Sequence, residues 1–340
     1  MSQPELSSAT AKAQSCGVPT AWSGVRHVLA CVNGDPFADA VLSHAAAVAK
    51  VLGARMTVIH VLKVTSTQEQ MDPVEWTLRH YDSIEYLNAC LSRFDGVHAE
   101  VVIVAGKPAE RISAWANEHG ADVIVLGRGG ESDGLSMGLG NTARGVAQSA
   151  NASVMLVPVL AANHSAIHYH KLLIPLDGAC RSECPLPLGL SIAMAHKAEV
   201  VLIHAAPKID LIEIDLLNAK AIALREQLYR HNESAARAYL DDLGARLPER
   251  PATRRRLLPS GDARRALVLA TTEEQADLVV LSAAGKSGHA DMTVGSVADY
   301  LINRLSIPVL LVRQHQPNLA KFHGTQCHAM DMRLPGLGMR

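Results

Sequence analysis

Two glycine-rich segments carry the residues whose types and spacing could bind a ligand. The first, GRGGESDGLSMGLGN, runs from Gly127 to Asn141, and the second, SAAGKSGHADMTVGS, runs from Ser282 to Ser296. Glycine permits positive φ and lets a ligand approach the backbone without a Cβ in between. Each segment also precedes a helical stretch, and the free N–H groups of a helix start attract anions. The two segments therefore predict phosphate binding.

Two familiar nucleotide motifs do not fit these segments. The letters GKS at 285–287 resemble the end of a P-loop, but Val280 occupies the position where that motif needs its first glycine. No G-x-G-x-x-G run follows the first apolar strand of either half, which argues against a dinucleotide dehydrogenase. The phosphate site predicted here is therefore of another kind.

Catalysis beside the phosphates would need a general base and an acid that holds a metal ion. The nearest candidates are Glu131 and Asp133 in the first segment and His289 and Asp291 in the second. Acidic residues in such segments are commonly solvated turn formers. We therefore expect no catalytic residue, and a slow ATP hydrolase stays an alternative to a binding protein.

The elements that must position the glycine segments alternate regularly along the chain. Short runs rich in valine and isoleucine, typical of strands covered on both faces, alternate with helical stretches such as 37–53, 108–120 and 212–243. Such alternation predicts an α/β fold with two Rossmann-like, doubly wound domains, each built on a five-stranded parallel sheet. The expected strands are 26–32, 55–62, 98–105, 121–126 and 152–159, then 171–176, 198–205, 254–259, 276–281 and 307–313.

The two halves of the chain repeat one pattern. Asn33 and Asp177 directly follow the first expected strand of each half and lie 144 residues apart, while Gly140 and Gly295 lie 155 apart. A period this long indicates a duplicated domain and not a solenoid unit. We expect domains at 25–160 and 171–314, with flexible termini at 1–24 and 315–340.

Composition excludes several classes of protein. Of 340 residues, 48% are hydrophobic and 19% charged, and the net charge is −1, so neither general disorder nor a nucleic-acid partner is expected. No run reaches the length of a membrane span, and the N-terminus lacks the pattern of a signal peptide, which predicts a cytoplasmic protein without a membrane partner. Cys180 and Cys184 have no second pair, so no metal site is expected. We interpret the run 254–256, three arginines, as a solvated strand edge or turn.

The sequence resembles the universal stress protein family, in tandem, over roughly residues 25–159 and 171–314. That family carries G-x2-G-x9-G-[S/T] after its fourth strand and an aspartate at the end of its first. The first half has Gly127, Gly130, Gly140 and Asn141 in this motif. The second half has Ser282, Gly285, Gly295 and Ser296, and IPLDGA at 174–179 matches the family's first strand.

The resemblance implies ATP as the bound cofactor, alone or with Mg²⁺, and a nucleotide-dependent switch in the stress response. It also implies that the last strands pair the two domains into an internal pseudo-dimer, with a homodimer of whole chains left open. A scaffold with two degenerate sites is the further alternative. The implied nucleotide contacts are Asn33, Val61, Gly127, Gly130, Gly140 and Asn141 in the first half, and Asp177, Ala205, Gly285, Gly295 and Ser296 in the second.

The charges of the two glycine segments favour the second half as the nucleotide site. Lys286 lies beside Gly285, whereas Glu131 and Asp133 in the first segment would oppose the charge of ATP unless a cation bridges them. Arg128 partly offsets those two carboxylates. The second half also keeps the family's acid and hydroxyl, Asp177 and Ser296, where the first half has asparagines. It departs from the motif at Ser282, which replaces a glycine.

Overall fold

The computed structural model describes most of the chain between residues 24 and 313. The termini that we expected to be flexible lie outside the described residues, apart from Gly24, as do Gly130 and Gly285 of the two glycine segments. The ranges described are 24–33, 38–63, 73–94, 98–129, 139–158, 167–207, 219–283 and 294–313.

The described first half alternates strands and helices as the apolar runs predict. Its strands coincide with the expected ones to within two residues at each end, because runs of valine and isoleucine shield both faces of a covered sheet. Pro108 begins its third helix, where a missing N–H costs nothing. The elements are β1 (His27–Val32), α1 (Ala38–Leu52), β2 (Arg55–Leu62), α2 (Pro73–Leu91), β3 (Ala99–Ala105), α3 (Pro108–Glu118), β4 (Val123–Gly127), α4 (Asn141–Ser149) and β5 (Ser153–Val157).

The second half repeats this order with one longer helix. The helical stretch expected at 212–243 corresponds to α6, which has 28 residues, whereas its counterpart α2 has 19. A short 3₁₀ helix, η1, follows the first strand of this half. The elements are β6 (Lys171–Leu176), η1 (Cys180–Glu183), α5 (Leu186–His196), β7 (Glu199–Pro207), α6 (Ala219–Arg246), β8 (Thr253–Gly261), α7 (Ala263–Glu273), β9 (Leu278–Ser282), α8 (Ser296–Arg304) and β10 (Val309–Val312).

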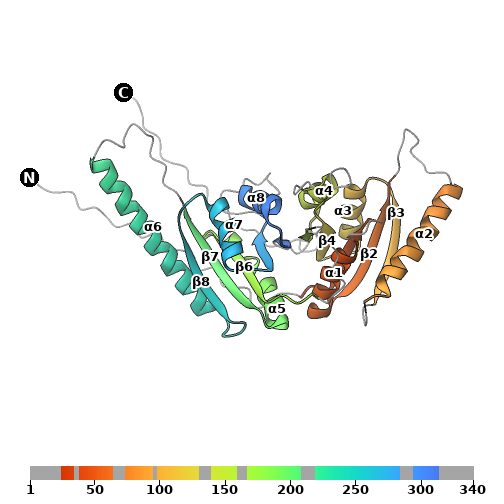
Figure 1. Cartoon of the computed structure of the whole chain (residues 1–340), viewed down its shortest axis with the longest axis horizontal. Coiled ribbons are helices and arrows are strands. Elements are labelled where there is room, and N and C mark those ends of the chain that lie inside the picture. The colour runs from red at the N-terminus through yellow and green to blue at the C-terminus, as the bar shows by residue number, and fades with distance from the viewer. Residues whose placement is uncertain are drawn as a thin grey trace, which may run out of the picture.

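Each half forms a five-stranded parallel sheet, and the two sheets join into one. The strand order is β3-β2-β1-β4-β5-β10-β9-β6-β7-β8, and the pairing is parallel within each half. At the centre, β5 and β10 pair antiparallel, with Met155 opposite Leu310. The predicted α/β fold class is confirmed, and the tandem forms one continuous ten-stranded sheet with α2 and α6 at its two outer ends (Figure 1).

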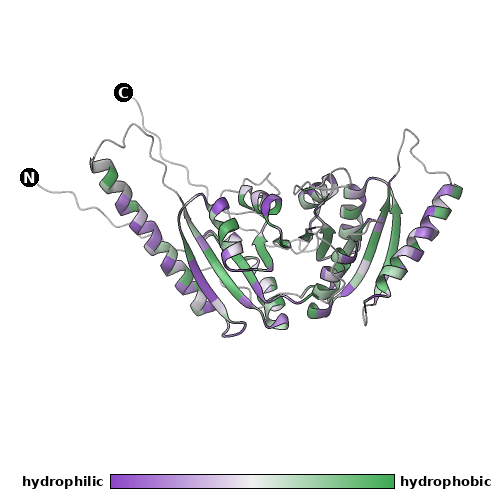
Figure 2. Ribbon diagram, viewed as in Figure 1, coloured by the Kyte–Doolittle hydropathy of each residue, from purple (hydrophilic) through white to green (hydrophobic). Residues whose placement is uncertain are grey.

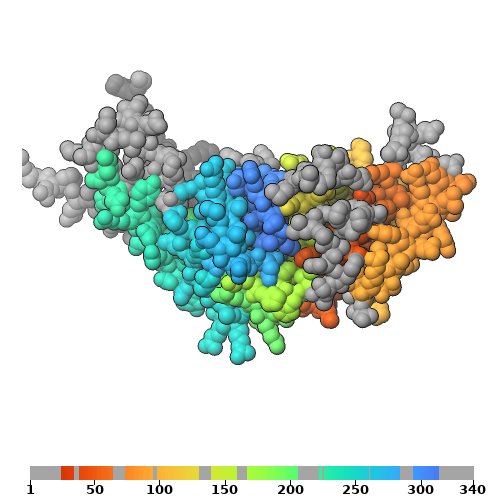
Figure 3. Space-filling view, viewed as in Figure 1, coloured from red at the N-terminus to blue at the C-terminus, as the bar shows by residue number. Residues whose placement is uncertain are grey.

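Helices cover both faces of the joined sheet. One apolar core contains side chains from α1, α2, α5 and α6, and the other contains side chains from α3, α4, α7 and α8. Both cores include residues of both halves, and the strands between the helices are predominantly apolar (Figure 2). In the space-filling view the two halves meet at the centre, where the blue carboxyl-terminal elements lie (Figure 3). The sheet and both cores therefore continue from one half into the other.

The join predicts how each half behaves when it is produced alone. Fragments 1–160 and 165–340 should fold as α/β domains, but each should self-associate through β5 or β10, because Val154 and Leu310 at that edge are fully buried in the whole chain. Light scattering after size exclusion should report a dimer for each fragment. Monomeric fragments at micromolar concentration, or fragments that do not fold, would contradict this expectation.

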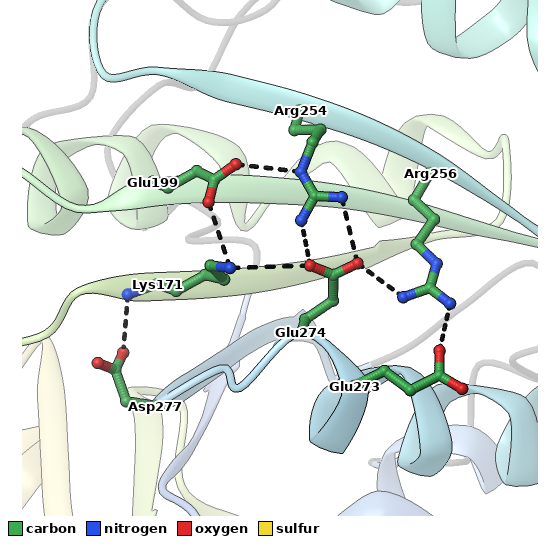
Figure 4. A network of polar contacts seen from close by, with 7 residues as sticks. All are labelled: Lys171, Glu199, Arg254, Arg256, Glu273, Glu274 and Asp277. Carbon is green, nitrogen blue, oxygen red and sulfur yellow. Dashed lines mark hydrogen bonds and ion pairs between the residues drawn. The ribbon is translucent and has the colours of Figure 1, made fainter.

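An ion-pair network lies along the edge strand β8, at the amino ends of the second-half strands. Arg254 and Arg256 both donate to Glu274, whose side chain is 7% exposed, and the Nζ of Lys171 lies 3.8 Å from the same carboxylate (Figure 4). Arg254 also donates to Glu199 at 3.1 Å. The arginine run does lie on a strand edge, as we interpreted it, but two of its three side chains bind a buried carboxylate that the sequence did not reveal.

Candidate functional site

A cavity of about 130 Å³ opens at the carboxyl ends of the second-half strands. Its position follows from the strand order, because β6 lies between β7 and β9 and the chain reverses its direction of winding there. Ligands of open α/β sheets bind at this kind of switch point. The lining residues come from β6, η1, β7, the start of α7, β9 and the start of α8: Pro175, Leu176, Asp177, Ser182, Ala205, Ala263, Leu267, Leu281, Ser282, Gly295, Ser296, Val297 and Ala298.

Four of the five second-half residues named from the sequence line this cavity. Asp177 follows β6, Ala205 lies near the end of β7, and Gly295 and Ser296 begin α8. The fifth, Gly285, lies outside the described residues. Parallel strands bring their carboxyl ends to one edge of the sheet, so residues far apart in sequence meet there.

The start of α8 provides donors for an anion. Gly295 is the N-cap residue, with φ −70° and ψ 156°, and among the described residues no side chain caps the helix. The first N–H groups of a helix have no intrahelical acceptor, and the residues that carry them, from Ser296 to Ala298, line the cavity. The helix dipole adds positive potential at the same point. A phosphate group would therefore find both donors and favourable potential at this end of the cavity.

A tight turn fixes Asp177, which also lines the cavity. Its carboxylate accepts a hydrogen bond from the backbone N–H of Ala179 at 2.9 Å, and its own N–H donates to the Ser182 hydroxyl at 3.3 Å. Gly178 between them has φ +77°, a conformation that favours glycine. The turn thus holds a polar side chain in the lining of a mostly apolar pocket.

Sequence reasoning missed the residues that brace this turn. Glu183 accepts hydrogen bonds from the Tyr239 hydroxyl at 3.1 Å and from two nitrogens of Arg246 at 3.2 Å. Burial, followed by the Glu183 carboxylate, raises the pKa of Tyr239, so its hydroxyl stays a donor. In the first half Arg93 donates to Asp39 at 2.6 Å, in the equivalent place. A comparison of the two halves for oppositely charged residues at equivalent positions could have found these ion pairs.

The first-half residues occupy equivalent places in their own sheet. Asn33 follows β1, Val61 lies in β2, Gly127 ends β4, Gly140 is the N-cap of α4, and Asn141 begins that helix. The strand order places β1 between β2 and β4, so these positions also gather at one edge. Several further residues of our sequence argument lie outside the described residues: Gly130, Glu131 and Asp133 in the first half and Lys286, His289 and Asp291 in the second.

The fold and the cavity define a duplicated, doubly wound α/β protein with a ligand pocket at a switch point. A family model described as the universal stress protein family matches residues 24–158 and 168–313. The chain therefore belongs to the universal stress protein family, as the resemblance implied.

Individual relatives agree with this assignment over most of their length. The chain is 24% identical over 305 residues to universal stress proteins Mb2028c of Mycobacterium bovis and Rv2005c of Mycobacterium tuberculosis, covering 84% of this chain and 97% of each relative. The solved structure of PA1789 from Pseudomonas aeruginosa aligns with a TM-score of 0.60 at 15% identity, over 85% of this chain and 92% of that one. A universal stress protein from Archaeoglobus fulgidus aligns with a TM-score of 0.58 at 17% identity, over 85% and 98%.

The described residues carry neither a candidate membrane span nor a candidate metal centre. No described helix is long and apolar enough to cross a membrane. Within the same ranges, no three side chains of histidine, cysteine, aspartate or glutamate are grouped so that they could hold a metal ion.

Proposed function

We propose that this chain binds ATP, alone or with Mg²⁺, in the cavity of its second half and acts as a nucleotide-dependent switch in the stress response. The observation that carries the proposal is the cavity itself, because Asp177, Ala205, Gly295 and Ser296 all line it. We assign the phosphates to the start of α8, where free N–H groups and the helix dipole favour an anion. We assign the base and ribose to the apolar wall between Ala205 and the turn at Asp177.

Nucleotide carried through a native purification tests this proposal directly. Mass analysis of the released ligand should identify an adenine nucleotide, and calorimetry on stripped protein should then report ATP binding. If neither experiment detects an adenine nucleotide, the proposal fails and the alternative of a scaffold with degenerate sites is favoured.

Hydrolysis of ATP should be slow. Of the described residues that line the cavity, Asp177 alone has an ionisable side chain, and its carboxylate already accepts a hydrogen bond from Ala179. A base paired with a metal-holding acid is therefore not assembled by these residues, and we expect turnover well below the ~1 s⁻¹ lower bound of typical enzymes. Release of phosphate should be measured for the parent, Asp291→Ala and Glu131→Ala. Fast turnover that is lost in either variant would make the protein an enzyme.

A further inference from the structure

The structure ties the α8 helix of the second half to the first half through its last turn. The guanidinium of Arg128, which follows β4, donates to the carbonyl oxygen of Ile302 at 2.6 Å. The backbone N–H of Leu139 donates to the side-chain oxygen of Asn303 at 3.1 Å. These two donors belong to the ends of the first glycine segment, and the N–H of Gly140 closes that segment by donating to the Arg128 carbonyl oxygen at 2.9 Å.

Arg128 has the chemistry of a buried anchor. The residue is only 5% exposed. Burial lowers the pKa of its guanidinium below the ordinary value, but the group is still a cation at neutral pH. The last carbonyl groups of a helix lack intrahelical donors, and the dipole makes them negative. A buried cation at this point therefore both satisfies a carbonyl oxygen and offsets the dipole. The two carboxylates that we expected Arg128 to offset, Glu131 and Asp133, lie outside the described residues, so that expectation stays a prediction.

The reciprocal contact uses a different arginine. Arg313, after β10, donates to the carbonyl oxygen of Ala147 in the last turn of α4. Ala147 and Ile302 are equivalent positions in the two halves, 155 residues apart. Each half therefore anchors the last turn of the other half's helix, through arginines at unrelated positions. This arrangement supplies a matched pair of variants, one for α8 and one for α4.

We infer that Arg128 of the first half is a positioning residue for the ligand site of the second half. The α8 helix is nine residues long, so its two ends lie about 13 Å apart and move as one rigid element. Its last turn is fixed by Arg128 and its first turn lines the cavity, where the proposed phosphate site lies. The inference rests on the proposed function for its ligand, and it makes the second-half site depend on the first half.

The test measures ATP affinity by calorimetry in full-length chains that all carry Gly140→Val. This substitution blocks any phosphate binding at the start of α4 in the first half. Arg128→Met keeps the length of the side chain but removes its donors, and should weaken binding roughly tenfold. Arg128→Lys retains the cation and should recover most of that loss. Arg313→Met is the matched control. Arg313 anchors α4 and not α8, so its loss should change the affinity for ATP less than about twofold. Equal losses for Arg128→Met and Arg313→Met, or no recovery with lysine, would overturn the inference.

Hydrogen exchange without ligand separates this inference from the proposed function. Arg128→Met should speed amide exchange across residues 296–304, including the first turn of α8, while Arg313→Met should speed exchange across 141–149. If the parent binds no ATP, the proposed function fails, and exchange alone decides whether Arg128 positions α8. Unchanged exchange in α8 would overturn the positioning role whether or not ATP binds.

Discussion

Substituting Gly295→Val should weaken ATP binding by about a hundredfold. Gly295 lines the cavity and precedes the free N–H groups of α8, so a branched side chain there would occupy the space that a phosphate needs. Loss of two charge-assisted hydrogen bonds, at about 1.5 kcal/mol each, accounts for an effect of this size. The backbone at Gly295 is extended, with φ −70°, so valine introduces no strain there. Calorimetry on the nucleotide-free variant measures the change.

The equivalent substitution in the first half is the control for this prediction. Gly140 is likewise an extended N-cap residue, with φ −63° and ψ 158°, so Gly140→Val perturbs the fold to a similar degree. We expect this variant to bind ATP within about threefold of the parent, because Gly140 does not line the second-half cavity and valine keeps the N–H that donates to the Arg128 carbonyl oxygen. Circular dichroism should report folded protein in both cases. If Gly140→Val proves the more damaging change, the nucleotide site is in the first half and our choice of half is wrong.

Substituting Glu274→Gln should lower the free energy of unfolding by about 3 kcal/mol. Removing one partner of a buried ion pair leaves uncompensated charge, at a cost of about 3–5 kcal/mol. Here Arg254 and Arg256 would lose their shared carboxylate and keep only Glu199 and Glu273. These remaining partners and the half-exposed position of Arg254 place the effect at the lower end of that range. Urea denaturation at neutral pH measures the difference from the parent.

A neighbouring carboxylate and a pH series complete this test. Glu273 binds Arg256 but is 59% exposed, so Glu273→Gln should change stability by less than about 0.5 kcal/mol. Burial alone would raise the pKa of Glu274, but the hydrogen bonds and charges of both arginines outweigh it and hold that pKa below its ordinary value. The carboxylate therefore stabilises the fold above the unfolded pKa of about 4.3, and this contribution is lost as pH falls through the lower folded pKa. A difference between parent and Glu274→Gln that persists unchanged to pH 2 would contradict this explanation.

Local patterns were sufficient to predict the elements and the class of fold. Runs such as VIVL at 123–126 can shield both faces of a covered strand, and their alternation with helical stretches leaves a parallel, doubly wound sheet as the simplest arrangement. The greater length of α6 relative to α2 could also be inferred from the sequence, because the spacing between equivalent residues of the two halves differs and this needs no knowledge of contacts.

The candidate site was predictable only where strand ends supply it. Asp177 and Ala205 could be placed beside the α8 start, because parallel strands bring their carboxyl ends to one edge of a sheet. Ala263 and Leu267, which complete the wall, carry no motif and reach the cavity through the packing of α7. The same limit applies to Glu183, since its partners Tyr239 and Arg246 lie more than 50 residues away.

The amino-acid sequence by itself determined the duplicated architecture and the edge at which ligands can bind, because both depend on hydrophobic period and turn chemistry within short segments. How the halves join was implied only by the family resemblance, and the tertiary structure supplied the strand pairing and its register. The β5–β10 pairing needs only strands with free edges, and the strand order gives each half two of them, β3 and β5 in the first and β8 and β10 in the second. The contact between Arg128 and Ile302 spans 174 residues and depends on where β4 and α8 end once the two sheets have joined. No short-range pattern encodes that position, so the dependence of one half on the other became visible only in three dimensions.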